Sequence, residues 1–176
     1  HGLELFRVNK IKFEIVLLTN ITQDHLDFHE TMENYIKAKL KIYDLNSKYK
    51  IINKKFKHLI DRKLIEFGDN YKNIENSKNG IKIKFDYYNE TVTIKTPYYG
   101  NCYIENLLAF ISIINNLKIK LKSFCFPKIL GRMQKISNEP ITIVDFAHTP
   151  DAVENVIKSI KGSLNNKIAV IFGCGG

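Results

Sequence analysis

The sequence predicts an α/β fold in which parallel strands alternate with crossover helices. A continuous apolar run, FEIVLLTNI, ends in polar residues and has the length of a buried strand (residues 13–21). Amphipathic helix patterns then alternate with strand patterns: helices at 31–48, 103–117 and 150–162, and strands within 48–53, 62–70, 140–147 and 167–176. Residues 80–96 alternate apolar and polar side chains on both sides of YNET, which predicts an antiparallel hairpin beside the parallel sheet.

Length and composition are those of a globular chain. The chain has 176 residues, 44% of them hydrophobic, so it can bury a core. No apolar run is long enough to span a bilayer and no signal peptide is visible, so we expect a cytoplasmic protein. The three cysteines form no CxxC pair, which favours reduced thiols over a zinc site. Because the sequence starts at His1 and stops after FGCGG, we expect a fragment of a longer protein.

The formal net charge of +9 raises the question of a nucleic-acid partner. Of the 27 basic residues only Arg7, Arg62 and Arg132 are arginine, whereas nucleic-acid surfaces favour arginine for bidentate and stacked contacts. The lysines accompany abundant asparagine and isoleucine, which indicates a general compositional bias. We therefore expect neither a nucleic-acid nor a membrane partner, and a basic nucleic-acid binder is the weakest alternative.

The segment TNITQDHLDFH, residues 19–29, follows the first predicted strand directly. It carries Asp24, His25, Asp27 and His29, four groups that could bind a metal or transfer protons. Ligands of open α/β sheets bind beyond the carboxyl ends of the strands, where this segment would lie. Oxygen-rich ligands with an imidazole would suit Mg²⁺ or Mn²⁺. The alternative is an ordinary solvated loop.

Lys39 occupies an unusual place on the next predicted helix, for which Thr31 is a possible N-cap. It falls in the middle of the face that carries the apolar side chains, whereas Lys37 and Lys41 face water: Met32, Tyr35, Ile36, Ile42 and Tyr43 share the face of Lys39. A cation directed at a core is costly unless it is paired or chemically changed. Lys39 either reaches past the core edge to water or a carboxylate, or is an amine able to form a carbamate with CO₂ and bind metal.

A third segment, ITIVDFAHTPDAVENV, places Asp145 and His148 at the end of a predicted strand. Thr149 can cap the helix that follows, with Pro150 at its first position. A helix N-terminus beyond a strand can bind an anion such as phosphate, although the pattern also fits a plain β–α turn. No G-x-x-x-x-G-K-[ST] loop occurs in the sequence, so a nucleotide-dependent enzyme would need this loop upstream.

Four segments in order resemble the Mur ligases of peptidoglycan synthesis: HGLELFRV, TNITQDHLDFHETMENYIKAKLKIY, GRMQ and IVDFAHTPDAVENV. The resemblance is closest to the MurE type, which adds the third amino acid to UDP-MurNAc-L-Ala-D-Glu. It implies that residues 1–129 are part of a parallel-sheet central ATPase domain, with the P-loop missing upstream. Residues 130–176 would begin an α/β Rossmann-like C-terminal ligase domain, and FGCGG resembles the start of its next glycine-rich segment.

The resemblance also implies a reaction. Such a ligase uses ATP and Mg²⁺ to join a carboxylate to an amine through an acyl phosphate. Its partners would be UDP-MurNAc-L-Ala-D-Glu and a free amino acid, with diaminopimelate, lysine and ornithine all open, and the enzyme would be a monomer. The isolated chain would be inactive. Two alternatives are another ligase of the Mur and folylpolyglutamate synthase superfamily, and a non-catalytic remnant or binding module that lacks the P-loop.

Individual residues match the family's functional positions. Lys39 matches a carbamylated lysine that helps to hold Mg²⁺, His25 a Mg²⁺ ligand, and Arg7 an arginine that contacts the UDP-muramoyl peptide. Four residues match positions on the ATP side: Asn106, Arg132, Asp145 and His148. The sequence departs from the family near Asn106, where GNCYIEN replaces G-x-F-N-V-Y-N, and has Leu5 and Leu130 where Gln and Pro are usual.

Overall fold

The computed structural model describes residues 2–8, 10–22, 26–77, 80–98, 100–120, 123–124, 126, 129–163 and 167–173. The chain divides into two compact units, which are His1–Asn70 with Glu105–Lys120, and Tyr71–Ile104 with Leu121–Gly176. Both units contain strands and helices, and the predicted α/β class is confirmed. The expected boundary between domains, after residue 129, stays a prediction.

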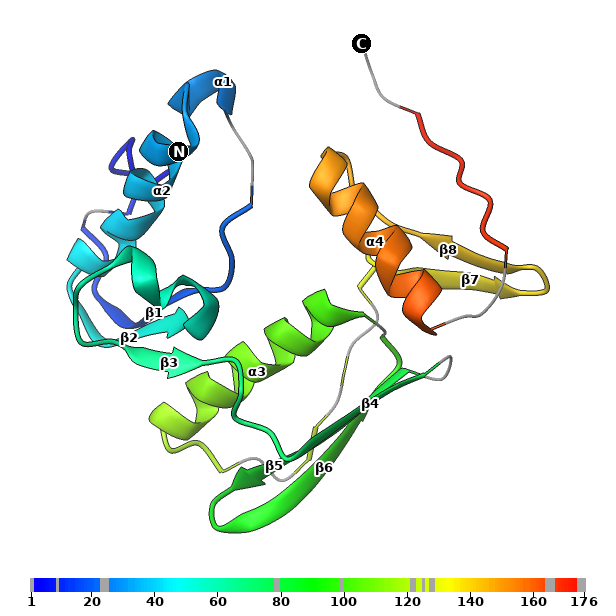
Figure 1. The fold of residues 1–176 in the computed structure, drawn as a ribbon. Helices are drawn as coiled ribbons and strands as arrows, with labels where there is room; N and C mark the ends of the chain where they lie inside the picture. Colours follow the sequence, from blue (N-terminus) through cyan, green and yellow to red (C-terminus); the bar gives the residue numbers. More distant parts are fainter. Residues whose placement is uncertain are drawn as a thin grey trace. The chain divides into compact units, whose positions relative to one another are not determined.

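A parallel sheet of order β1–β2–β3 forms the centre of the first unit (Figure 1). Its strands are β1 (Phe13–Leu18), β2 (Ser47–Asn53) and β3 (Ile65–Phe67). The chain crosses from β1 to β2 through α1 (Leu26–His29), α2 (Met32–Leu40) and the 3₁₀ helix η1 (Lys41–Asp44), and from β2 to β3 through η2 (Lys54–Leu59). The predicted parallel sheet with a helical crossover is thus confirmed for the strands predicted at 13–21, 48–53 and 62–70, whereas the strand predicted at 140–147 pairs antiparallel with residues 134–138.

The helix predicted over residues 31–48 is correct at its start and wrong at its end. Thr31 is the N-cap, because its Oγ1 accepts a hydrogen bond from the backbone N–H of Asn34 at 3.2 Å. The α-helix stops at Leu40, and η1 follows. The reason is that the chain must already rejoin the sheet at Asn46, whose carbonyl accepts the N–H of Phe13 at 3.1 Å.

Tyr43 lies at the centre of the apolar core of this unit. Its side chain is fully buried, and its hydroxyl donates to the carbonyl of Ile51 at 2.8 Å. The other buried members of this cluster come from the two neighbouring strands: Val16, Leu18 and Ile52. Partly buried side chains from η1 and η2, among them Ile42 and Phe56, close the cluster. Strand and crossover therefore share one core.

Because Tyr43 is buried, we expect the stability of the first unit to decrease at alkaline pH. Burial raises the pKa of the Tyr43 hydroxyl above its ordinary value, because the phenolate would lose its hydration. The stability that neutral Tyr43 contributes is therefore complete below pH about 10 and is lost as the pH rises toward the higher pKa of the folded state. We expect the free energy of unfolding, measured by urea denaturation between pH about 8 and 11, to fall less steeply in Tyr43→Phe than in the wild type.

A matched control is available for this pH series. Tyr88→Phe makes the same chemical change at a side chain that is 42% exposed, so it should keep the wild-type slope. Equal slopes for Tyr43→Phe and Tyr88→Phe would contradict a role for Tyr43 in the alkaline transition.

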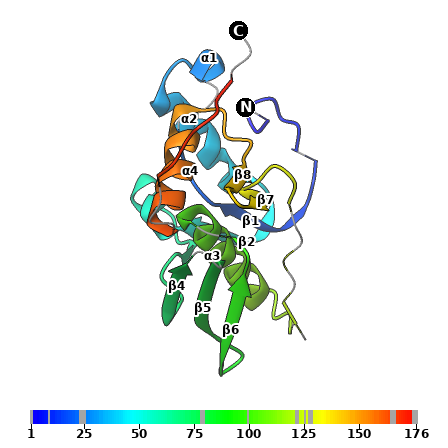
Figure 2. The same ribbon diagram turned by 90° about the vertical axis from the view of Figure 1, so that its right-hand side faces the viewer.

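The second unit contains an antiparallel sheet of order β4–β5–β6 (Figure 2). Its strands are β4 (Asn73–Ser77), β5 (Gly80–Tyr87) and β6 (Glu90–Thr96). The predicted hairpin is β5–β6, whereas β4 was not predicted. Alternate side chains of β5 are buried, namely Ile81, Ile83, Phe85 and Tyr87, and the ring of Phe124 packs edge-on against the last two.

A second antiparallel pair in this unit consists of β7 (Gln134–Asn138) and β8 (Ile141–Val144), with α4 (Pro150–Ser163) alongside (Figure 1). The helix predicted at 150–162 is confirmed, as is the one at 103–117, which is α3 (Asn101–Asn116). The strand predicted over 167–176 is wrong in its described part, because no described strand pairs with residues 167–173. None of the described helices combines the length and hydropathy that crossing a bilayer requires.

Candidate functional site

The ammonium of Lys39 is held between a backbone carbonyl and an aromatic ring. Its Nζ donates to the carbonyl of Asn20 at 3.1 Å and lies 5.0 Å from the centre of the Tyr35 ring. Tyr35 is one turn earlier on α2 and only 4% exposed, so the ring is a fixed surface. The charge expected to face the core thus has two partners at the core edge, where an ammonium over an aromatic face is stabilised.

Asn53 fixes the backbone that meets Lys39. Its amide side chain is 1% exposed, and Nδ2 donates to the carbonyl of Thr19 at 3.1 Å. Its Oδ1 accepts the N–H of Lys55 and so caps η2. Asn53 ends β2 and Thr19 follows β1, so the bond ties together the carboxyl ends of two parallel strands, where α/β proteins bind ligands. Sequence reasoning missed Asn53, because its partner lies 34 residues away.

The structure describes only part of the segment TNITQDHLDFH, residues 19–29. Asp24 and His25 lie outside the described residues. The two that are described diverge: Asp27 is exposed, whereas His29 is 5% exposed and packs its ring against Phe28 and Tyr35. Nε2 of His29 is the one buried side-chain polar atom, among those described, without a hydrogen-bond partner. No group of three or more His, Cys, Asp or Glu residues in the described part of the chain could hold a metal ion.

Lys41, which was predicted to face water, forms an ion pair with Glu4. Its Nζ contacts both carboxylate oxygens of Glu4, at 2.7 and 2.8 Å, and this bond lowers the pKa of the Glu4 carboxyl. The pair ties the segment that carries Arg7 to the residue that follows α2, two positions after Lys39. Arg7 itself is exposed, and its backbone N–H donates to the carbonyl of Gly2 at 3.1 Å. The pairing was not predictable, because 37 residues separate the two partners.

In the second unit the structure brings Arg132, Asp145 and His148 to one end of the β7–β8 hairpin. Both oxygens of Asp145 are used internally: Oδ2 accepts the N–H of Met133 at 2.7 Å, and Oδ1 accepts the N–H of Ala147 at 2.8 Å. The guanidinium carbon of Arg132 lies 5.4 Å from the centre of the Phe146 ring. Nδ1 of His148 lies 3.1 Å from the carbonyl of Phe146. The side chains of Arg132 and His148 are both exposed at this end of the hairpin.

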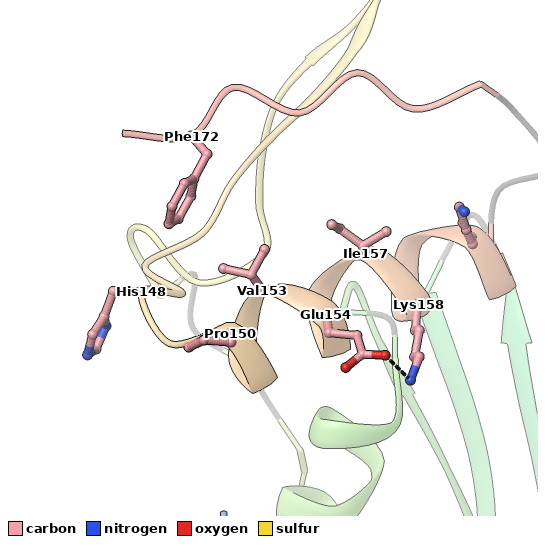
Figure 3. Close-up of a pocket in the computed structure, with 8 residues that line it drawn as sticks. His148, Pro150, Val153, Glu154, Ile157, Lys158 and Phe172 are labelled. Atoms are coloured by element: carbon pink, nitrogen blue, oxygen red, sulfur yellow. Dashed lines mark ion pairs between the residues drawn. The ribbon is translucent and has the colours of Figure 1, made fainter. Parts of the chain in front are cut away.

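The start of α4 adjoins these residues. Thr149 caps the helix as predicted, with Oγ1 accepting the N–H of Ala152 at 3.3 Å. A pocket of about 630 Å³ opens along the helix (Figure 3). His148 and Phe172 lie toward one end, the apolar side chains of Val153 and Ile157 point from α4, and Glu154 pairs with Lys158 at 2.6 Å. The lining of the pocket is mostly apolar, and its charged side chains are Glu154, Lys158 and Lys161.

Asn106, the remaining candidate, is exposed on α3. It belongs to the first unit, whereas Arg132, Asp145 and His148 belong to the second.

Two family models cover nearly the whole chain. Residues 1–114 match the Mur ligase middle domain, and residues 131–176 match the Mur ligase glutamate ligase domain. The chain belongs to the Mur ligase family. The match includes Arg7, Lys39 and Asn106 in the first model, and Arg132, Asp145 and His148 in the second.

Curated Mur ligases match this chain along its full length. The UDP-N-acetylmuramoyl-L-alanyl-D-glutamate–2,6-diaminopimelate ligase of Rickettsia conorii is 34% identical over 100% of the chain, and that of Clostridium perfringens is 35% identical over 100%. The chain spans 41% of the length of each relative.

Solved Mur ligases and their structural neighbours share the fold. A structure of a ligase with the same name has 28% identity and a TM-score of 0.67, and the chain covers 41% of it. MurF of Thermotoga maritima in complex with ADP has a TM-score of 0.69, with 90% of this chain aligned to 41% of that one. A folylpolyglutamate synthase complex with AMPPCP and folate has a TM-score of 0.64, with 91% aligned to 45%. The last two are 16% identical and therefore show only the shared fold.

Proposed function

We propose that this chain is part of an ATP-dependent ligase that joins 2,6-diaminopimelate to UDP-N-acetylmuramoyl-L-alanyl-D-glutamate in peptidoglycan synthesis. The observation that carries the proposal is the match to ligases of that name along all of the chain, at 32–35% identity. A folylpolyglutamate synthase is the less supported alternative, because its likeness at 16% identity extends to the fold alone. We place the enzyme in the cytoplasm, as a monomer.

The proposed reaction has two steps. The carboxylate of the UDP-linked dipeptide attacks the γ-phosphorus of ATP, which forms an acyl phosphate and releases ADP. The amine of diaminopimelate then attacks the acyl carbon, phosphate leaves with its bonding electrons, and the amine loses a proton as the amide forms. Charge develops on oxygen in both steps, so cationic groups and Mg²⁺ would stabilise the transition states.

Lys39 and His25 are the residues that we assign to Mg²⁺. The position of Lys39 fits such a role, because its side chain reaches the carboxyl edge of the parallel sheet at Asn20, next to the segment that contains His25. As a carbamate, Lys39 would supply an anionic oxygen ligand of the kind that Mg²⁺ prefers. The bound ion would neutralise negative charge on the phosphates of ATP.

The other assignments rest on the match of these residues to the family's functional positions. Arg7 is exposed on a segment tied to the end of α2 and would bind the UDP-muramoyl peptide. Asn106 would contact the nucleotide from α3, and Arg132 and His148 from the end of the β7–β8 hairpin. Asp145 would act on the nucleotide through the backbone that its carboxylate holds.

An amine panel tests the proposal. The complete polypeptide that contains this chain is supplied with ATP, Mg²⁺, UDP-MurNAc-L-Ala-D-Glu and one of diaminopimelate, lysine or ornithine, and the product mass and ADP release are measured. We expect ADP release to require both substrates, with diaminopimelate favoured over the other amines. Turnover with folate and glutamate instead would identify the alternative ligase, and no turnover with any pair would support a non-catalytic remnant.

A further inference from the structure

We propose that Phe146 is a positioning residue, which orients the guanidinium of Arg132 for the phosphates of the nucleotide. The inference rests on the proposed role of Arg132 in binding ATP. It gives a role to Phe146, which the sequence left unassigned within the segment IVDFAHTPDAVENV, and it gives Asp145 a defined part in the same arrangement.

Arg132 closes a tight turn, because its N–H donates to the carbonyl of Ile129 at 3.3 Å, and the backbone on both sides of it is also held. Gly131 and Met133 both have positive φ angles, +67° and +46°. The N–H of Gly131 donates to Oε1 of Gln134 at 2.8 Å, and the N–H of Met133 donates to Oδ2 of Asp145 at 2.7 Å. The side chain of Met133 is 4% exposed and anchors the turn, whereas the side chain of the preceding residue, Arg132, is exposed.

The same aspartate places Phe146 against this turn. Oδ1 of Asp145 accepts the N–H of Ala147, so the residue between them is held in a side-chain-closed turn. A Cβ atom added at Gly131 would lie 3.9 Å from a ring carbon of Phe146, which means that the ring borders the turn closely. The guanidinium of Arg132 extends over the face of that ring, 5.4 Å from its centre.

The ring of Phe146 has two polar neighbours. It contacts the guanidinium of Arg132 on a neighbouring turn and lies 6.3 Å from the His148 ring. A guanidinium stacked on a ring keeps the N–H groups at its edge free, and those groups bind phosphate oxygens. The ring also restricts the rotamers of a long side chain, so less freedom is lost when the nucleotide binds.

A double-mutant cycle on the complete polypeptide tests whether Phe146 acts through Arg132. We expect Phe146→Ala to raise the KM for ATP about two- to five-fold, the range of an exposed cation–π contact, with a smaller effect on kcat. Phe146→Tyr should restore the KM, because it keeps the ring. In an Arg132→Ala background, Phe146→Ala should cause no further rise. Ile136→Ala, at a side chain 58% exposed on the same hairpin, is the control and should match the wild type.

Two results would overturn the proposal. One is an equal rise in KM for Phe146→Ala with and without Arg132, which would mean that the ring contacts the nucleotide by itself. The other is a failure of Phe146→Tyr to restore the KM.

A second readout does not depend on catalysis. The Nε–H signal of Arg132 in an arginine-labelled NMR spectrum, assigned by its loss in Arg132→Lys, should carry an upfield ring-current shift. That shift should persist in Phe146→Tyr and disappear in Phe146→Leu. An unchanged signal in Phe146→Leu would refute the contact. If the wild-type polypeptide shows no ATP-dependent ligation, the proposed function fails, whereas the NMR signal still decides the contact between these two side chains.

Discussion

Replacing Lys39 by alanine in the complete polypeptide is expected to reduce ligase turnover about 100- to 1,000-fold, the usual effect of removing one preorganised group from a charged transition state. The side chain is the one cation of α2 that reaches the carboxyl edge of the parallel sheet, by its contact with Asn20 at 3.1 Å. In the proposed enzyme a carbamate on Lys39 would help to hold Mg²⁺. Formate or acetate should restore part of the activity of Lys39→Ala, because either anion can occupy the space of the missing carbamate.

Lys37→Ala is the matched control for this experiment. Lys37 lies on the same helix, its side chain is 68% exposed, and its ion-pair partner is Glu33 one turn earlier. It should retain wild-type turnover and should not respond to formate. Full activity in Lys39→Ala would contradict the assignment, and so would a large loss that neither formate nor acetate relieves while the variant stays folded.

The second large effect is on stability. Ile52→Ala should lower the free energy of unfolding of the first unit by about 2–5 kcal/mol, and Ile52→Val by about 0.5–1.5 kcal/mol. Ile52 is 0% exposed on β2 and packs with Val16, Leu18 and Tyr43, so truncation leaves a cavity between the sheet and its crossover. Urea denaturation followed by tyrosine fluorescence is suited to the measurement, since the chain contains no tryptophan.

The same substitution at Ile11 supplies the comparison. That side chain is 50% exposed, so Ile11→Ala should change the free energy of unfolding by no more than about 0.5 kcal/mol. Similar losses for Ile11→Ala and Ile52→Ala would show that the cluster around Tyr43 is not the core that stabilises this unit.

The elements that could be predicted are those whose pattern is local. The apolar run at β1, the cap at Thr31 and the alternation across β5 and β6 each identify an element without information from the rest of the chain. β4 and β7 were missed because NIENS and QKISN contain few apolar residues and become strands only by pairing with β5 and β8. Residues 167–173 show the reverse, an apolar sequence without a partner strand in the described part of the chain.

The residues of the candidate site also divide into those with a local signal in the sequence and those without one. Lys39 could be selected from the sequence because a cation on an apolar face is anomalous within its own helix. Asn53 and Glu4 could not, because each acts through a partner more than 30 residues away. Phe146 lies within the segment IVDFAHTPDAVENV, but the sequence assigns it no role, because its contact with Arg132 joins residues on two different turns.

The measurement that tests the proposed ligation most directly is the transfer of ¹⁸O. UDP-MurNAc-L-Ala-D-Glu labelled with ¹⁸O in the reacting carboxylate is incubated with the complete polypeptide, ATP, Mg²⁺ and diaminopimelate, and the released phosphate is analysed by mass spectrometry. An acyl phosphate pathway predicts one ¹⁸O atom in each phosphate for every amide formed. Amide formation with unlabelled phosphate, or with AMP as the nucleotide product, would contradict it.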